Sequence, residues 1–169
     1  FHAQPIACPV CGPRLVLLDK AGRPIDGDPI RRAAPMLAQG QILAIKGLGG
    51  FHLAADAASE QAVQRLRCLK ARDQKPFALM LPCVAAAERI CILDESSRLL
   101  LEDITRPIVI SPQRPGHGIA PGVSPGLDTF GIMLPYAPHH YLLFAEGLGP
   151  LVMTSGNPAD EPIIKDNDE

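Results

Sequence analysis

The chain has 169 residues, 47% of them hydrophobic, and its 16 basic and 18 acidic side chains leave a formal net charge of −2. That length predicts one main domain with its own core, and the charge excludes a strong overall attraction to nucleic acids or anionic membranes. No apolar run approaches the roughly 20 residues of a membrane-spanning helix. We therefore expect neither a membrane nor a nucleic acid as a partner.

The first 24 residues contain a Cys-x-x-Cys pair, Cys8 and Cys11, followed by an apolar run at 15–18. This pattern predicts a turn and then a strand, in a segment too short to have a core of its own. The cysteine spacing suits zinc, but tetrahedral zinc takes four ligands, so the pair makes half a site. The chain begins with Phe1 in place of Met, and we interpret it as a piece of a longer protein.

Helical and strand patterns alternate along the rest of the sequence. Periodicity and capping residues predict helices at 30–38, 59–71, 85–90, 96–102 and 138–145. Short apolar runs predict strands at 42–45, 77–81, 106–110, 131–134 and 150–154. The order predicts an α/β domain around one sheet and leaves the direction of each strand open.

Two predicted loops are rich in glycine or in proline and glycine. The glycine-rich residues 47–50 match neither the Rossmann nor the P-loop pattern, so we interpret them as a tight turn. Residues 111–130 contain four prolines and four glycines, which is too irregular for a hairpin turn. We expect this second segment to be a mobile, lid-like loop.

The five cysteines are odd in number and do not resemble a disulfide framework, which favours a reducing, cytoplasmic location. Cys68, Cys83 and Cys91 lie on or beside predicted helices. Free cysteines in such places usually behave as small core residues, and we assign these three that role.

Five cations occur within eleven residues, at Arg65, Arg67, Lys70, Arg72 and Lys75. The simple interpretation is a solvated helix end that complements the helix dipole, and we adopt it for Arg65 and Arg67. Lys70 and Arg72 lie where the helix leads into the next strand. These two are candidates for neutralising the phosphates of a nucleotide.

Thr154, Ser155 and Asn157 directly follow the last predicted strand, where α/β proteins tend to bind ligands. An ordinary polar turn is the alternative interpretation of the same residues. His139 and His140 begin a predicted helix. Neighbouring positions point in different directions around a helix, so we expect packing or a helix-end hydrogen bond for them in place of a metal site.

Taken together, residues 44–56, 70–76, 131–140 and 151–157 resemble the YrdC-like domain of the HypF family of hydrogenase maturation carbamoyltransferases. Residues 1–13 are similar to the end of that family's second zinc-finger module, whose first cysteine pair lies upstream. The resemblance implies a YrdC-like twisted mixed sheet with flanking helices and a concave nucleotide cleft, preceded by a partial zinc-ribbon-like segment. It divides the chain into 1–24 and 25–169, with the second domain continuing past Glu169.

The wider YrdC-like family carries a Lys-x-Arg and a later Ser-x-Asn signature, matched here by Lys70 with Arg72 and by Ser155 with Asn157. The resemblance therefore implies a catalytic role for Lys70 and Arg72. The residues that it implies for nucleotide or carbamate binding are Lys46, His52, Thr154, Ser155 and Asn157. It also implies Zn²⁺ at Cys8 and Cys11, provided that the upstream pair is present.

The implied reaction is formation of carbamoyl-adenylate from ATP, with Mg²⁺, and carbamate derived from carbamoyl phosphate. Another domain of the same longer chain would pass the carbamoyl group to a cysteine of HypE, for the cyanide ligands of nickel-iron hydrogenase. Lys70, Arg72 and the metal would offset the repulsion between carbamate and triphosphate.

Two alternatives remain. Threonylcarbamoyl-adenylate synthases of tRNA modification share both signatures, but they have a Pro-Thr-x-Thr-x-Tyr-Gly-Leu loop in place of residues 46–53 and an Arg in place of Met133. A non-catalytic module that binds structured RNA is the other alternative. The net charge of −2 and the seven aromatic residues argue against RNA binding.

Overall fold

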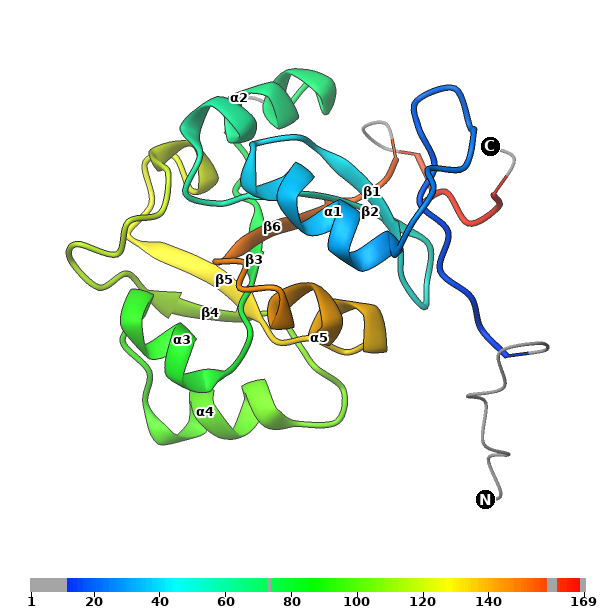
Figure 1. Ribbon diagram of the computed structural model, residues 1–169. Coiled ribbons are helices and arrows are strands. Elements are labelled where there is room, and N and C mark those ends of the chain that lie inside the picture. The colour runs from blue at the N-terminus through cyan, green and yellow to red at the C-terminus, as the bar shows by residue number, and fades with distance from the viewer. Residues whose placement is uncertain (1–11, 73, 158–160, 168–169) are drawn as a thin grey trace.

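The computed structural model describes residues 12–72, 74–157 and 161–167, which form a twisted sheet flanked by helices (Figure 1). The α-helices are α1 Pro29–Ala38, α2 Glu60–Leu69, α3 Val84–Ile90, α4 Glu95–Glu102 and α5 Pro138–Ala145, and a short 3₁₀ helix, η1, spans Pro121–Val123. The strands are β1 Leu43–Lys46, β2 Phe51–Asp56, β3 Ala78–Met80, β4 Val109–Pro112, β5 Thr129–Met133 and β6 Leu151–Ser155.

The six strands form one mixed sheet in the order β1-β2-β6-β3-β5-β4. Neighbouring strands are antiparallel except β3 and β5, which are parallel. The last strand, β6, is inserted between β2 and β3, where His52 faces Ser155 and Met80 faces Leu151. The end of β6 is thus held beside the start of β2, far from it in sequence.

Both faces of the sheet are covered, because alternate strand residues enter two different apolar clusters. In β6, Val152 packs in the cluster that also contains α2, α3 and α4 residues. Its neighbours Leu151 and Met153 pack in the second cluster, with residues of α1 and α5. The domain therefore has three layers, with the sheet in the middle (Figure 1).

Helix α2 shows how local sequence positions the site. Ser59 caps it, its hydroxyl accepting a hydrogen bond from the Ala62 amide at 3.3 Å. Ala62, Val63 and Leu66 lie on one face and are fully buried, which fixes the helix against the sheet. Lys70 is the C-terminal cap, so the next residues leave the helix at the edge of the sheet.

Most of the predicted elements are confirmed to within a few residues, but strand β2 was not predicted. Its sequence directly follows the glycine turn and contains no clear alternation, so its pairing with β1 and β6 had no local signal. The strand predicted at 15–18 is wrong. Among the described residues of that region there is only an isolated bridge between Leu18 and Pro24, and Val16 is exposed.

The proline- and glycine-rich loop is packed more firmly than a mobile lid. The Phe77 amide donates to the Val123 carbonyl at 2.9 Å, and the Ala120 amide donates to the Ala57 carbonyl at 2.9 Å. Val123 is fully buried in the core. The middle of the loop is therefore part of the folded domain. Of the helices that the structure describes, none is long and apolar enough to cross a bilayer.

The packing of α2 predicts a contrast between two leucines of the same helix. Leu66 is completely buried, whereas Leu69 is 70% exposed. Leu66→Ala should lower the free energy of unfolding by about 2–5 kcal/mol, because it leaves a cavity under α2. Leu69→Ala should change it by less than about 0.5 kcal/mol. Urea unfolding followed by circular dichroism measures both, and equal losses would show that α2 is not anchored through Leu66.

Candidate functional site

The candidate site forms where the end of α2 meets the end of β6. The ammonium of Lys70 donates to the Ser155 carbonyl at 2.8 Å, to the Asn157 side-chain Oδ1 at 3.0 Å and to the Asn157 carbonyl. The lysine is buried despite its charge. Three oxygen acceptors match its three N–H bonds, which makes that burial tolerable.

Arg72 approaches the same strand from the opposite side of a tight turn. Ala71, between the two cations, has φ of 45°, a left-handed conformation that a residue with a side chain rarely adopts. The turn lets one Arg72 amino group donate to the Thr154 hydroxyl at 3.2 Å and the other to the Pro76 carbonyl at 3.0 Å. Its Nε is buried without a hydrogen-bond partner among the described residues.

The aromatic ring of Phe77 contacts the arginine side chains at this turn. The guanidinium of Arg72 lies 5.0 Å from the centre of its ring and that of Arg67 lies 4.8 Å from it, both within cation–π range. Arg67 is buried, with Nε donating to the Gly122 carbonyl at 2.6 Å and an amino group donating to the Arg72 carbonyl at 2.8 Å. The prediction of a solvated helix-end role for Arg67 is therefore wrong.

Spacing alone does not distinguish Arg67 from its exposed neighbour Arg65. The available signal was position: Arg67 follows Val63 by four residues and so lies on the apolar face of α2. It acts as a positioning residue that ties α2 to the loop and to the backbone of Arg72.

The site has an excess of positive charge. Burial, and then the neighbouring charges of Arg72 and Lys75, lower the pKa of Lys70. Burial, and then the charge of Arg67, lower the pKa of Arg72. Within the described part of the chain, neither Lys70 nor Arg72 forms an ion pair with a carboxylate. A bound anion would offset the positive charge of this group of donors.

The residues after β6 form a compact polar turn. The Ser155 hydroxyl donates to Asn157 Oδ1, and the Asn157 amide nitrogen donates to the Glu161 carbonyl. Gly156 has a strict steric role, because a Cβ there would lie 2.9 Å from the Phe51 carbonyl. The structure thus brings together Lys70, Arg72, Thr154, Ser155 and Asn157, the five predicted residues that flank α2 and end β6.

The side chains of the other two predicted binding residues, His52 and Lys46, make their hydrogen bonds to residues outside this group. His52 faces Ser155 across the β2–β6 pairing and is half-buried, and burial lowers its pKa. Its Nε2 lies 3.4 Å from the Tyr136 hydroxyl. Lys46 is exposed, and its ammonium donates to Asn167 Oδ1 at 2.6 Å and lies 5.5 Å from the Phe51 ring centre.

A cluster of rings extends from His52 beneath the start of α5. Tyr136 meets His140 edge-on at 4.7 Å between ring centres, and His139 lies 4.3 Å from His140. The predicted packing role is confirmed for His140, which is 1% exposed. Both of its ring nitrogens lack a hydrogen-bond partner among the described residues. Burial, and then the nearby His139 and His52, lower the pKa of His140 to about 3.

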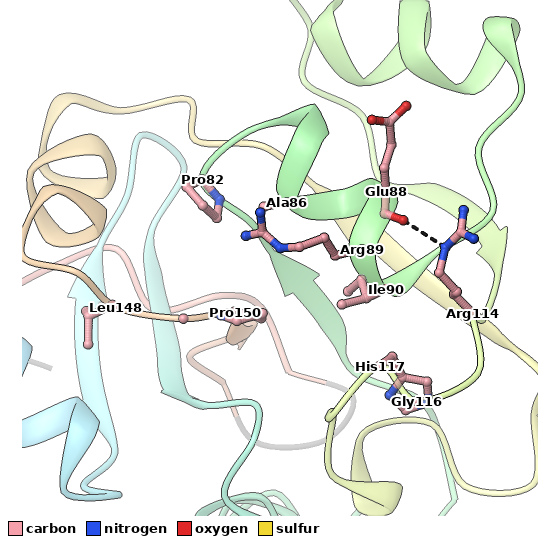
Figure 2. Close-up of a pocket in the computed structure, with 11 residues that line it drawn as sticks. Pro82, Ala86, Glu88, Arg89, Ile90, Arg114, Gly116, His117, Leu148 and Pro150 are labelled. Carbon is pink, nitrogen blue, oxygen red and sulfur yellow. Dashed lines mark hydrogen bonds between the residues drawn. The ribbon is translucent and has the colours of Figure 1, made fainter.

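A cavity elsewhere in the domain does not coincide with this site. A cavity of about 670 Å³ lies beside α3, between Pro82 after β3 and Pro150 before β6 (Figure 2). Ser155 is at the opposite end of β6. We take the site from the side-chain chemistry, because none of the predicted residues lines that cavity.

The cysteine predictions have different outcomes. Cys8 and Cys11 lie outside the described residues. Cys91 is buried, as expected of a core residue, and burial raises the pKa of its thiol to about 11. Cys68 and Cys83 are exposed, so the core role predicted for them is wrong: each lies on the solvent side of its helix or helix start.

With this geometry in place, sequence comparison decides the family. The model of the Sua5/YciO/YrdC family, described as telomere recombination, matches residues 35–169. The chain belongs to the Sua5/YciO/YrdC family. A second model, the HypF finger, matches residues 1–18.

The similar proteins of this Sua5/YciO/YrdC chain include carbamoyltransferase HypF of Rhodobacter capsulatus, 48% identical over 100% of the chain and 22% of the relative. A crystal structure of full-length HypF in a phosphate- and nucleotide-bound form superposes with a TM-score of 0.91 at 46% identity, covering 100% of this chain and 22% of that one. Sua5 of P. abyssi shares the fold, with a TM-score of 0.72 at 22% identity over 80% of this chain and 41% of that one. The chain thus spans about a fifth of the length of its HypF relatives.

The buried His140 predicts a pH-dependent loss of stability. Its folded pKa, about 3, lies below the ordinary 6.5, so the unfolded chain binds this proton more readily. Stability should therefore fall as the pH drops from 6.5 towards 3, by about 2–3 kcal/mol at pH 4.5. In His140→Phe this contribution should disappear, and the unfolding free energies at pH 7.5 and 4.5 measure it. His117→Phe is the matched control, and a loss of stability between pH 7.5 and 4.5 that is as large in His140→Phe as in the wild type would contradict the assignment.

Proposed function

We propose that this chain carries out the adenylating step of a carbamoyltransferase, forming carbamoyl-adenylate and pyrophosphate from ATP and carbamate. The observation that carries the proposal is the pair Lys70 and Arg72, two partly buried cations that form no ion pair with a carboxylate of the described residues and that are held against Thr154, Ser155 and Asn157. Such donors suit phosphate oxygens. The high identity to proteins named carbamoyltransferase supports the choice of the acyl group.

In the proposed step a carbamate oxygen attacks the α-phosphorus of ATP. A new phosphorus–oxygen bond forms, the bond from that phosphorus to the oxygen bridging to the β-phosphate breaks, and pyrophosphate leaves with the electron pair. Lys70 and Arg72 act by reducing the repulsion between the two anions as they approach. Mg²⁺ bound to the triphosphate would contribute further positive charge.

The free chain already engages most of the donors, which limits how ATP can bind. All three N–H bonds of Lys70 have oxygen acceptors, so contact with a phosphate requires the exchange of one of these bonds. Both amino groups of Arg72 are engaged by Thr154 and Pro76 and its Nε is buried, so contact between Arg72 and a phosphate also requires these bonds to exchange. In this proposal Lys70 and Arg72 contact phosphate oxygens after that exchange, and Ser155 and Asn157 orient the nucleotide. His52 and Lys46 would flank the carbamate end.

The wider setting is part of the proposal. Residues 1–24 would complete a zinc-binding module with a cysteine pair supplied from upstream, and residues 25–169 would form the adenylating domain. Carbamate would come from carbamoyl phosphate through another domain of a longer cytoplasmic chain. The carbamoyl group would then pass to a cysteine of HypE.

The test is ATP-dependent release of pyrophosphate by the chain when carbamate is supplied directly as ammonium carbamate. We expect release by the wild type and a loss of about 10²–10³-fold in kcat for Lys70→Ala, because a donor to the developing charge is removed. Lys20→Ala is the control, because it removes the charge of an exposed lysine that is distant from Lys70 in the sequence. This variant should have wild-type activity.

Two results would contradict the proposal. Release that requires threonine and bicarbonate would indicate the related threonylcarbamoyl-adenylate chemistry. Undiminished release by Lys70→Ala, with wild-type ATP affinity, would show that the cation pair does not serve the reaction.

A further inference from the structure

A second group of basic side chains surrounds the 670 Å³ cavity beside α3. Its volume is in the range of sites that bind small molecules. Four segments build the walls: the loop between β3 and α3, α3 itself, the loop after β4 and the loop before β6 (Figure 2). The cavity shares no residue with the Lys70 site, and nothing proposed above assigns it a role.

Three side chains give the cavity its hydrogen-bond donors. Arg89 is exposed, and no contact ties its guanidinium to any other described residue. Arg114 uses Nε to donate to the Glu88 carbonyl at 2.9 Å, which leaves its two amino groups available within the described structure. The Nδ1 of His117 accepts from the Ile119 amide at 3.0 Å, so in the neutral ring Nε2 carries the proton and is a donor.

The acidic residue of the lining does not neutralise these donors. The Glu88 carboxylate is engaged by Arg98, with Nε and Oε1 2.7 Å apart. Figure 2 shows this carboxylate pointing away from Arg114, so that Glu88 offers the cavity its backbone and not its charge. Arg89 and Arg114 therefore both line the cavity, from opposite sides of α3 in Figure 2, without a compensating carboxylate in the lining.

The simpler explanation of the arginines is helix capping, and it covers only part of the observations. Arg114 Nε does cap a carbonyl in the last turn of α3, and Arg89 lies in that turn, where cations are favourable. Capping does not account for the four free N–H bonds of the Arg114 amino groups, or for a cavity of this size beside them. Nor does it account for His117, which comes from another segment.

The remaining walls leave room for a ligand with a small apolar body. They are formed by Pro82, Ala86, Ile90, Leu148 and Pro150. Gly116 and Gly149 also line the cavity, and a Cβ built on either would meet nothing within 4 Å. A ligand can therefore approach the backbone closely at both glycines.

We propose that this cavity binds a small molecule bearing phosphate or carboxylate oxygens, held by Arg89, Arg114 and His117. Guanidinium groups recognise both kinds of oxyanion through paired N–H donors. The apolar wall contacts the body of the ligand, and the two glycines let its oxygens reach backbone amides. This binding is independent of the adenylating reaction.

Titrations of the ¹⁵N-labelled chain test the proposal, with inorganic pyrophosphate and citrate as probes for the two oxyanion classes. The amide signals of Gly116 and Gly149 report on the cavity, and those of Gly47 and Gly156 report on the Lys70 side. We expect saturable shifts of Gly116 and Gly149 with at least one probe. The more tightly bound probe identifies phosphate or carboxylate as the preferred group.

Three variants make the result specific. Arg89→Gln should weaken binding at least tenfold, and because Arg89 is exposed and unpartnered among the described residues, the fold should be unaffected. Arg31→Gln, the same change at an exposed position of α1, and Lys70→Ala should leave the Gly116 and Gly149 titrations unchanged. The proposal is overturned if neither probe moves these two signals, if only Gly47 and Gly156 respond, or if Arg89→Gln binds as tightly as the wild type.

Discussion

The hydrogen bonds of a single buried ammonium connect the parts of this domain on which the site depends. Lys70 caps the C-terminus of α2, and its three acceptors belong to the last residue of β6 and to the turn that follows it. An ammonium removed from water is costly unless each N–H has a partner, so the turn must adopt the one shape that supplies three oxygens. Lys70 thereby defines the conformation of the Ser155–Asn157 turn and also places a positive charge beside that turn.

Arg67 and Phe77 stabilise this arrangement through contacts with Arg72. The two guanidiniums near the Phe77 ring carry like charges, and among the described residues each donates hydrogen bonds to backbone carbonyls. Neutral acceptors satisfy the hydrogen bonds without cancelling the charge. The result is a region that is sterically fixed and still electrostatically attractive to anions.

Sequence patterns predicted most of the helices and strands because capping residues and apolar periodicity act over short distances. Ser59 and the face of Val63 and Leu66 marked α2, for example. They did not predict β2, whose edges are defined by pairing with β1 and β6. For the site, the Lys70, Arg72, Ser155 and Asn157 signatures predicted the right neighbours. The burial of Arg67 and the exposure of Cys68 depend on which face of α2 packs against the sheet. The cluster of basic residues at the end of α2 made that face difficult to identify from the sequence.

The insertion of β6 between β2 and β3 has a consequence for how the domain acquires its site. Lys70 and Asn157 are 87 positions apart, and Arg72 and Thr154 are 82 apart. Contacts over such separations form late in folding, because the chain entropy of closing the intervening loop must be overcome first. On the ribosome β6 also emerges after every other strand of the sheet. A nascent chain can therefore build α2, β3 and the β4–β5 pair while it has no site at all, and Lys70 and Arg72 lack their partners Ser155, Asn157 and Thr154 until the last strand arrives.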